Sequence, residues 1–216
     1  MFIVTALKAQ ARVADRVNVF IDGKFRFSLD ASQVLQLGVK TGNEYTEAEI
    51  ESLEVESQYG KTYMRALEYS LVRPRSTKEM RAYLYRKTRD TRTQNGSIKK
   101  GVSPEITKRV LAKLIEKGYV DDEKFARFWV DNRHLRKGVS KRKLSQELMA
   151  KGVDAAIIET TLASSERADY DELKKVIQKK SKRYETEEKL VRYLMSQGFR
   201  YDDIKHVLAE DSSLMN

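Results

Sequence analysis

The apolar positions of the chain recur as a unit. Segment 144–162 has the spacing of two short helices around a glycine, and the same spacing returns 46 residues later in segment 190–208. The polar residues between the shared positions differ. Glycine after a helix adopts the left-handed conformation that ends it, so each segment predicts a helix, a turn and a second helix. The shared positions are Leu144, Leu148, Met149, Gly152, Ile158 and Leu162, matched by Leu190, Leu194, Met195, Gly198, Ile204 and Leu208.

An earlier copy of the unit contains extra residues. Met80 and Leu84 match Leu144 and Leu148 at an offset of 64, whereas Ile106 matches Ile158 at an offset of 52. The difference predicts a twelve-residue insertion between the second and third helices of this copy. The first helices of the later two copies match at an offset of 48, and this match pairs Phe125, Phe128 and Trp129 with Leu173, Val176 and Ile177.

A strand pattern precedes the helical copies. Apolar residues alternate on both sides of Asp22-Gly23, which predicts a type I′ β-hairpin over residues 16–29. Residues 2–7 predict a third strand. Residues 30–38 predict a short helix that Asp30 or Ser32 caps and Gly38 ends, and Thr46 starts a helix to about Gln58. Helical spacing begins again at about Lys61.

These patterns predict a mainly α fold with three tandem three-helix repeats in an elongated arrangement, because such units bury their apolar faces by stacking. A small α+β module with a β-hairpin precedes the repeats. The predicted domains are 1–60 for that module, 61–120 for repeat 1 with a basic insertion at about 86–101, 121–166 for repeat 2 and 167–216 for repeat 3.

Composition limits the class of protein. The 216 residues include no cysteine, which excludes disulfides and thiolate metal sites and suits a reducing compartment. The first basic residue, Lys8, follows a short apolar stretch that predicts neither a signal peptide nor a membrane span. We therefore expect a cytoplasmic protein with no membrane association. His134 and His206 are the only histidines and have no metal-ligand pattern beside them, so no metal site and no catalytic site are predicted.

Positive charge is concentrated in the helical region. Residues 1–60 carry six Lys/Arg and nine Asp/Glu, while the remainder carries 36 Lys/Arg and 23 Asp/Glu. A basic helical region indicates a polyanionic partner, either a nucleic acid or an assembly that contains one. The alternative interpretation is a solvated, lysine-rich surface.

The segment GYVDDEKFARFWVDNR at 118–133, with VLAKLIEK before it and RKGVSKRKLSQELMAKGV after it, resembles the RecX family. The resemblance covers about residues 61–208, and the strand module resembles an extension of some members. It implies a regulator in DNA repair, recombination and the SOS response that binds the RecA filament on single-stranded DNA and inhibits its activities. It also implies a monomer without cofactor or catalysis. The matching residues are Gly118, Tyr119, Asp121, Asp122, Phe125, Ala126, Glu147, Leu148 and Gly152.

Basic residues near the predicted connections are candidates for contact with DNA or a partner. Arginines are favoured because a guanidinium binds phosphate or carboxylate through two hydrogen bonds. For any single lysine, solvation remains the simpler interpretation. The candidates are Arg73, Arg75, Arg81, Arg86, Lys87, Arg89, Arg92, Arg133, Arg136, Lys137, Lys141, Arg142, Lys182 and Arg183.

The insertion, within residues 86–101, departs from the family pattern. Its composition, with Asp90 as the one acid, predicts a mobile basic loop that contacts phosphates or an acidic filament surface, or that is a tolerated excursion. Two other classes of function remain: a protein that binds nucleic acid directly through helix-turn-helix-like repeats, and a scaffold for an unrelated acidic protein. Direct binding predicts high affinity for naked nucleic acid.

Overall fold

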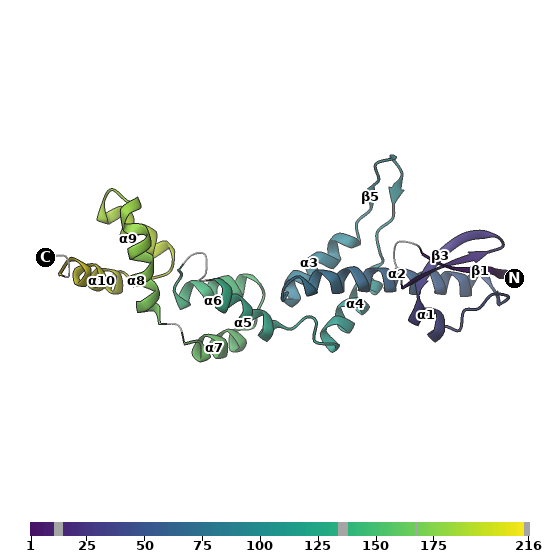
Figure 1. Cartoon of the computed structure of the whole chain (residues 1–216), viewed down its shortest axis with the longest axis horizontal. Coiled ribbons are helices and arrows are strands. Elements are labelled where there is room, and N and C mark those ends of the chain that lie inside the picture. The colour runs from purple at the N-terminus through teal and green to yellow at the C-terminus, as the bar shows by residue number, and fades with distance from the viewer. Residues whose placement is uncertain (11–14, 134–137, 167, 214–216) are drawn as a thin grey trace. The chain divides into compact units, whose positions relative to one another are not determined.

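The computed structural model describes residues 1–10, 15–133, 138–166 and 168–213, which are mainly helical (Figure 1). They form two compact units, one of Met1–Arg73 with Met80–Tyr119 and the other of Pro74–Glu79 with the chain from Val120. The strands are β1 (Phe2–Ala9), β2 (Arg16–Ile21), β3 (Lys24–Asp30), β4 (Glu44–Tyr45), β5 (Thr91–Arg92) and β6 (Ile98–Lys99). The helices are α1 (Ala31–Gln36), α2 (Glu47–Leu71), α3 (Thr77–Lys87), α4 (Pro104–Glu116), α5 (Asp122–Arg133), α6 (Lys141–Ala150), α7 (Ala155–Ser164), α8 (Asp169–Lys180), η1 (Ser181–Arg183), α9 (Glu187–Ser196) and α10 (Tyr201–Ser213).

The amino-terminal module contains a four-stranded antiparallel sheet in the order β3-β2-β1-β4. The predicted hairpin is confirmed, since Asp22 and Gly23 have φ of 49° and 79°, the positive values that a type I′ turn requires. The third strand is confirmed as well, whereas the two-residue β4 has no signal in the sequence. One face of the sheet buries Val4, Val19 and Leu29 against the first half of α2.

The predicted alternation fails at one end of the hairpin. Phe25 is 54% exposed although it lies in phase with the buried Phe27 and Leu29. The cause is an irregularity in the pairing: Val19 pairs with Phe27, but Phe20 pairs with Phe25, so one residue of β3 is left over. A bulge of this kind turns the following side chain to the other face of the sheet.

A single helix, α2, runs through the position where a break was expected. The start at Thr46 is confirmed by its capping box with Glu49, but the predicted end near Gln58 is wrong. Gly60 lies inside the helix, where an added Cβ would overlap the side chain of Gln33. Glycine is therefore needed here for the close approach of α1 to α2, which Gln33 secures by donating to the Glu56 carbonyl (2.7 Å). The domain boundaries stay a prediction.

None of the described helices is both long and apolar enough to span a membrane.

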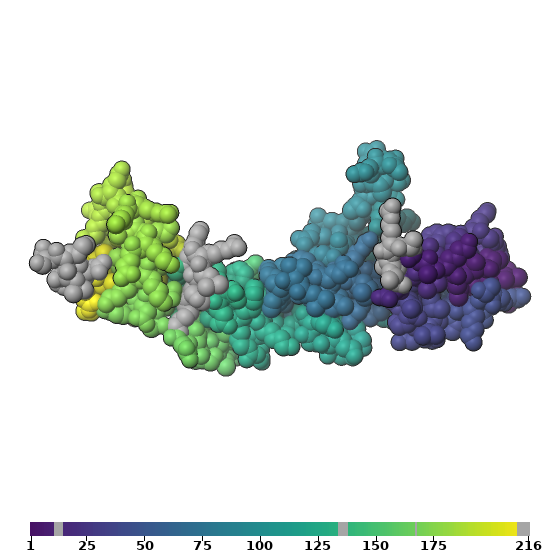
Figure 2. All heavy atoms as spheres, viewed as in Figure 1, coloured from purple at the N-terminus to yellow at the C-terminus, as the bar shows by residue number. Residues whose placement is uncertain are grey.

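In the first unit, α2 packs against α4, and the insertion lies between α3 and α4. Arg109 of α4 makes a bidentate ion pair with Glu56 of α2 and stacks on Tyr59. The cap of α4 by Ser103 with Pro104 at the first helical position is confirmed. The insertion, predicted as a loop, forms a β-hairpin of β5 and β6 that projects from this unit (Figures 1 and 2).

Two further three-helix groups follow, each with its own core. Phe125, Leu144 and Leu148 are buried in the group α5–α7, and Leu173, Leu190 and Leu194 in the group α8–α10. The offset of 48 between their first helices is wrong. Asp122 and Asp169 begin α5 and α8, so the offset is 47, and it aligns the buried Ala126 and Val130 with Leu173 and Ile177. The half-buried Phe128 had been mistaken for a core position.

The second helix of one repeat is fastened at its start to the next repeat, and we call this set of contacts the inter-repeat joint. All of the contacts described here lie within the second compact unit. The N–H of Thr77 donates to Asp122 Oδ1 (2.8 Å), and the hydroxyl of Ser76 donates to the Lys151 carbonyl (2.8 Å). Asp122, the first residue of α5, therefore also caps α3.

The joint recurs at the start of α6. The N–H of Lys141 donates to Asp169 Oδ1 (2.8 Å), and the N–H of Ser140 donates to the Gln197 carbonyl (3.1 Å). Ser140 caps α6, as Ser76 caps α3, by accepting from the N–H three residues on. Residues at equivalent positions thus meet equivalent partners in two successive repeats, although Ser76 donates from its hydroxyl and Ser140 from its backbone N–H.

Glycine at the joint has two functions. Gly152 and Gly198 have φ of 78° and 93°, which confirms the prediction that they end their helices in the left-handed conformation. Each also lies against the preceding repeat: an added Cβ on Gly152 would come within 2.8 Å of the Lys78 Cβ, and one on Gly198 would overlap the Ser140 hydroxyl. The recurrence of glycine therefore reflects packing as well as backbone conformation.

Candidate nucleic-acid and partner interface

Each of the three helical repeats presents exposed cationic side chains. Arg81 lies on α3, Arg142 on α6, and Lys182 and Arg183 on η1 just before α9. Within the part of the chain that the structure describes, none of the four has a carboxylate at ion-pair distance. Their charge is therefore available to an anionic partner.

Other candidate residues are held by intramolecular contacts. Arg75 is only 12% exposed and lies 4.0 Å from the Glu79 carboxylate, and Arg73 is half-buried. Arg133 donates from Nε and Nη2 to the two oxygens of Glu147 (2.9 and 2.8 Å), which also accepts from the indole of Trp129 (3.0 Å). These contacts hold Arg75 and Arg133 as partly buried structural residues. Trp129 itself is partly buried and packs against the core of α5–α7.

Replacing Arg133 by alanine is expected to lower the free energy of unfolding by about 1.5–3 kcal/mol, because two charge-assisted hydrogen bonds to the partly buried Glu147 are lost. The matched control Arg142→Ala removes an exposed guanidinium from the same repeat and should stay within about 0.5 kcal/mol of the parent. Urea denaturation followed by circular dichroism measures both. Equal stability of the two variants would contradict the structural role of Arg133.

Three positions discussed from the sequence lie outside the described residues: His134 and the candidates Arg136 and Lys137. Lys141 is half-buried, and its Nζ donates to the Ser165 carbonyl (3.4 Å). His206 lies on the surface of α10, with Nε2 3.2 Å from Glu210. The histidine that is described is thus an exposed residue of a helix.

The insertion completes a basic cavity in the first unit. Arg86, Lys87 and Arg89, three of the predicted residues, line it together, whereas Arg92 lies on β5 and does not. The cavity, of about 170 Å³, is formed by α2, the end of α3 and the base of the β5–β6 hairpin. No acidic residue lines it. We call it the basic pocket, and its lining residues are Thr62, Arg65, Arg86, Lys87, Arg89, Thr91, Lys99, Lys100 and Val102.

Hydrogen bonds close the base of the hairpin beside this pocket. The N–H of Val102 donates to the Lys87 carbonyl (2.9 Å), and the N–H of Gly101 donates to Asp90 Oδ1 (2.8 Å). Gly101 passes so close to Thr88 that an added Cβ would overlap the Thr88 carbonyl. The one acid of the insertion is thus engaged in holding the hairpin, and Lys99 and Lys100 are held beside the cations of α3.

The positive charge of this region perturbs its members. Burial and the nearby charges of Arg16, Lys99 and Arg65 lower the pKa of Lys61. Burial likewise lowers the pKa of Arg16, and Arg65 adds to this, although Asp30 opposes it. Mutual repulsion of this kind destabilises the protonated groups, and an anion bound among them would relieve it.

Sequence reasoning missed the contribution of α2 to the pocket. Arg65, Lys99 and Lys100 are not among the contact residues that the sequence predicts. Lys61 and Arg65 are four residues apart on one helix, so they share a face, and this spacing was a usable signal. The pairing of that face with the end of α3 depends on tertiary structure and has no local signature.

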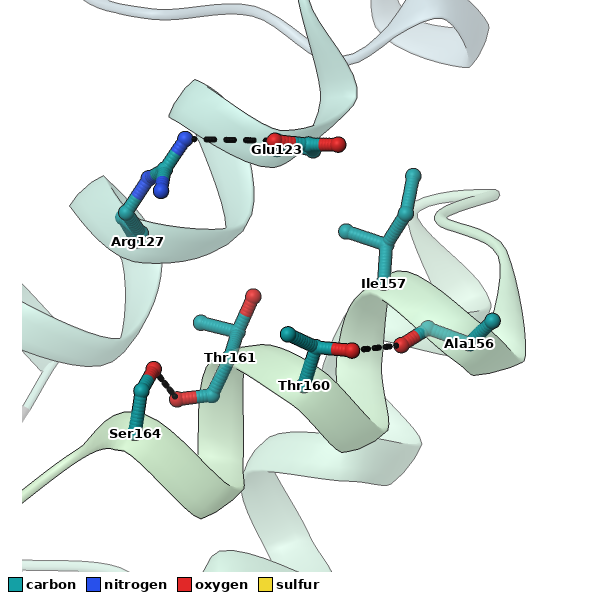
Figure 3. Close-up of a pocket in the computed structure, with 7 residues that line it drawn as sticks. All are labelled: Glu123, Arg127, Ala156, Ile157, Thr160, Thr161 and Ser164. Atoms are coloured by element: carbon teal, nitrogen blue, oxygen red, sulfur yellow. Dashed lines mark hydrogen bonds and ion pairs between the residues drawn. The ribbon is translucent and has the colours of Figure 1, made fainter.

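A second cavity, between α5 and α7, lacks reactive groups (Figure 3). Its charged residues neutralise one another, since Arg127 donates to Glu123 at 3.3 Å. Two of its three hydroxyls donate within α7, from Thr160 to the Ala156 carbonyl and from Ser164 to the Thr161 carbonyl. Among the described residues, no group of three His, Asp or Glu is placed to hold a metal ion. The cavity therefore offers no support for a catalytic site.

The fold and the exposed cations together define a class: a mainly α, tandem-repeat binding protein with a small β-sheet module. Comparison with known proteins is more specific. Residues 2–46 match the regulatory protein RecX N-terminal domain, and residues 121–162 match the RecX second three-helix domain. The chain belongs to the RecX family of regulatory proteins.

Curated relatives support this assignment over nearly the whole chain. Regulatory protein RecX of Bacillus licheniformis is 31% identical over 96% of this chain and 76% of its own length. The Bacillus subtilis protein is 30% identical over 93% of this chain and 74% of its own length. A crystal structure of regulatory protein RecX has a TM-score of 0.71 at 20% identity, covering 97% of this chain and all of the other, which supports the fold.

Proposed function

We propose that this protein binds the RecA filament on single-stranded DNA, lies in the filament groove and inhibits its ATPase, strand-exchange and co-protease activities. Family membership supports a regulatory role. The observation that carries the finer proposal is the presence of exposed cations on every helical repeat, at Arg81, Arg142, Lys182 and Arg183. A nucleoprotein filament repeats its anionic surface, so several repeats of one chain can contact it at once.

The mechanism is steric and electrostatic and needs no cofactor or catalysis. Each contact is weak, but the first contact raises the effective concentration of the remaining repeats. A monomer that occupies the groove in this way obstructs a second DNA strand and bridges neighbouring recombinase subunits. We place this activity in the cytoplasm, where the recombinase acts on DNA.

The test is the rate of ATP hydrolysis by preformed recombinase filaments on single-stranded DNA as the protein is titrated in. Suppression at well below one molecule per recombinase subunit is expected. A parallel assay measures binding to bare single-stranded DNA at the same salt concentration. Unchanged hydrolysis together with tight, salt-sensitive binding to bare DNA would overturn the proposal.

Direct nucleic-acid binding is the second candidate function, and the basic pocket is the observation that favours it. Salt dependence separates the two, since binding to bare DNA weakens steeply as salt displaces the protein from phosphates. Filament binding also includes protein–protein contacts, so we expect a smaller loss of affinity with salt.

A further inference from the structure

We propose that the basic pocket is a binding site for the phosphodiester backbone of single-stranded nucleic acid, which the protein binds there without a recombinase. This inference rests on the second candidate function, direct nucleic-acid binding, and deepens it by assigning the ligand and the site to the first unit alone. The site consists of side chains from α2, the end of α3 and the β5–β6 hairpin.

The donors of the pocket suit phosphate. Arg65, Arg86 and Arg89 each offer a planar fork of N–H groups, which matches two phosphate oxygens. Among the described residues, none of these three arginines has a carboxylate at ion-pair distance. With Lys99 and Lys100 they form a cluster of one sign, held at an open cavity where a strand can enter.

The pocket is fixed in place rather than formed by chance among long side chains. Its hairpin is closed at the base by the Val102–Lys87 and Gly101–Asp90 hydrogen bonds, and Gly101 is needed for that close approach. Burial, and after it repulsion from Arg16, Lys99 and Arg65, lowers the pKa of Lys61 beside the pocket. A bound phosphate would relieve this repulsion.

An exposed aromatic ring favours a nucleic acid over an acidic protein. Tyr85 is 60% exposed, and its ring lies 5.1 Å from the guanidinium carbon of Arg89. Proteins that bind single strands combine a basic groove with aromatic rings on which bases stack. The Tyr85 ring, beside the pocket residue Arg89, offers such a surface, whereas recognition of an acidic peptide needs no base-stacking ring.

The test uses the full chain, without recombinase, and a fluorescein-labelled single-stranded oligothymidylate, with binding measured by fluorescence anisotropy at several low salt concentrations. Arg86→Gln with Arg89→Gln should raise Kd by about tenfold or more and reduce the magnitude of the salt slope by roughly 1.4, at about 0.7 for each lost phosphate contact. The matched control, Lys24→Gln with Lys40→Gln, removes the same charge from exposed positions of the amino-terminal module and should change Kd by less than about threefold. Equal losses in both double variants would overturn the proposed site.

A second pair of variants keeps the charge and alters only the scaffold. Gly101→Ala should open the base of the hairpin and weaken oligothymidylate binding about fivefold or more. Gly96→Ala lies at the hairpin tip, where φ is 78° and strains an alanine, but an added Cβ meets nothing within 4 Å, so the base of the hairpin should stay closed and binding should change little. Binding unaffected by Gly101→Ala, or displacement of the oligonucleotide by poly-glutamate as effective as displacement by unlabelled oligothymidylate, would contradict a built phosphate site.

The outcome is independent of the proposed regulation. A protein that suppresses filament ATP hydrolysis but binds oligothymidylate equally well with and without Arg86 and Arg89 would overturn this inference and leave the proposed function intact. Pocket-dependent binding to the oligonucleotide with no effect on ATP hydrolysis would support this inference and overturn the proposed regulation.

Discussion

Removal of residues 167–216 is expected to raise the concentration needed for half-maximal suppression of recombinase ATP hydrolysis by about 100-fold or more. Effective concentration multiplies the affinities of linked sites, so the loss of one repeat costs more than the loss of one contact. ATP hydrolysis by preformed filaments, titrated with the truncated and the full chain, measures the difference. The comparison is Arg142→Ala, an exposed contact, which should cost roughly tenfold at most.

The truncated protein should remain folded in the part that is kept. The core around Phe125, Leu144 and Leu148 is complete by Leu162 and shares no residue with the core of α8–α10. A cooperative thermal transition in circular dichroism verifies this. If the folded, truncated chain inhibits as well as the full chain, the account based on several linked repeats is wrong.

Replacing Gly198 by alanine is expected to lower the free energy of unfolding by about 2–5 kcal/mol. The left-handed conformation costs a residue with a Cβ about 1–2 kcal/mol, and overpacking against a fixed neighbour adds about 1–3 kcal/mol. The neighbours are the Ser140 hydroxyl and Lys143, whose backbone nitrogen would lie 3.1 Å from the new methyl group. Denaturant unfolding measures the loss.

Gly38 supplies the matched control, because it also follows a helix with positive φ (65°) but has nothing within 4 Å of an added Cβ. Gly38→Ala should therefore cost only the backbone part, about 1–2 kcal/mol. If the two variants lose equal stability, close packing at the joint contributes nothing, and Gly198 is a helix terminator alone.

Local chemistry explains what could be predicted of the fold. Asp22-Gly23 encodes its turn, and Asp30, Thr46 and Ser103 encode helix starts through hydrogen bonds to residues two or three positions away. The failures involve distant partners. The local sequence around Gly60 predicts the end of a helix, because it does not show that Gln33 packs against this glycine. The bulge that exposes Phe25 depends on how β3 pairs with β2.

The same contrast between local and distant partners separates the candidate contact residues that were interpreted correctly from those that were not. Arg133 looks like a surface cation until Glu147, fourteen residues on, is found to bind it. The insertion was read correctly as basic, but hairpin pairing between Thr91 and Lys99 could not be read from so polar a segment. Arg65 was missed because its neighbours in the pocket come from a part of the chain more than twenty residues away.

The location of the inter-repeat joint has a consequence for how this chain can change over time. The inter-repeat joint is formed at the start of α3, by Ser76 and Thr77. The inserted hairpin follows the other end of this eleven-residue helix, roughly 16 Å away. An insertion at the free end therefore leaves the fastening undisturbed. One repeat can therefore acquire a new surface while its neighbours keep theirs. The start of α3 holds the repeats together, and its end is where the surface can vary.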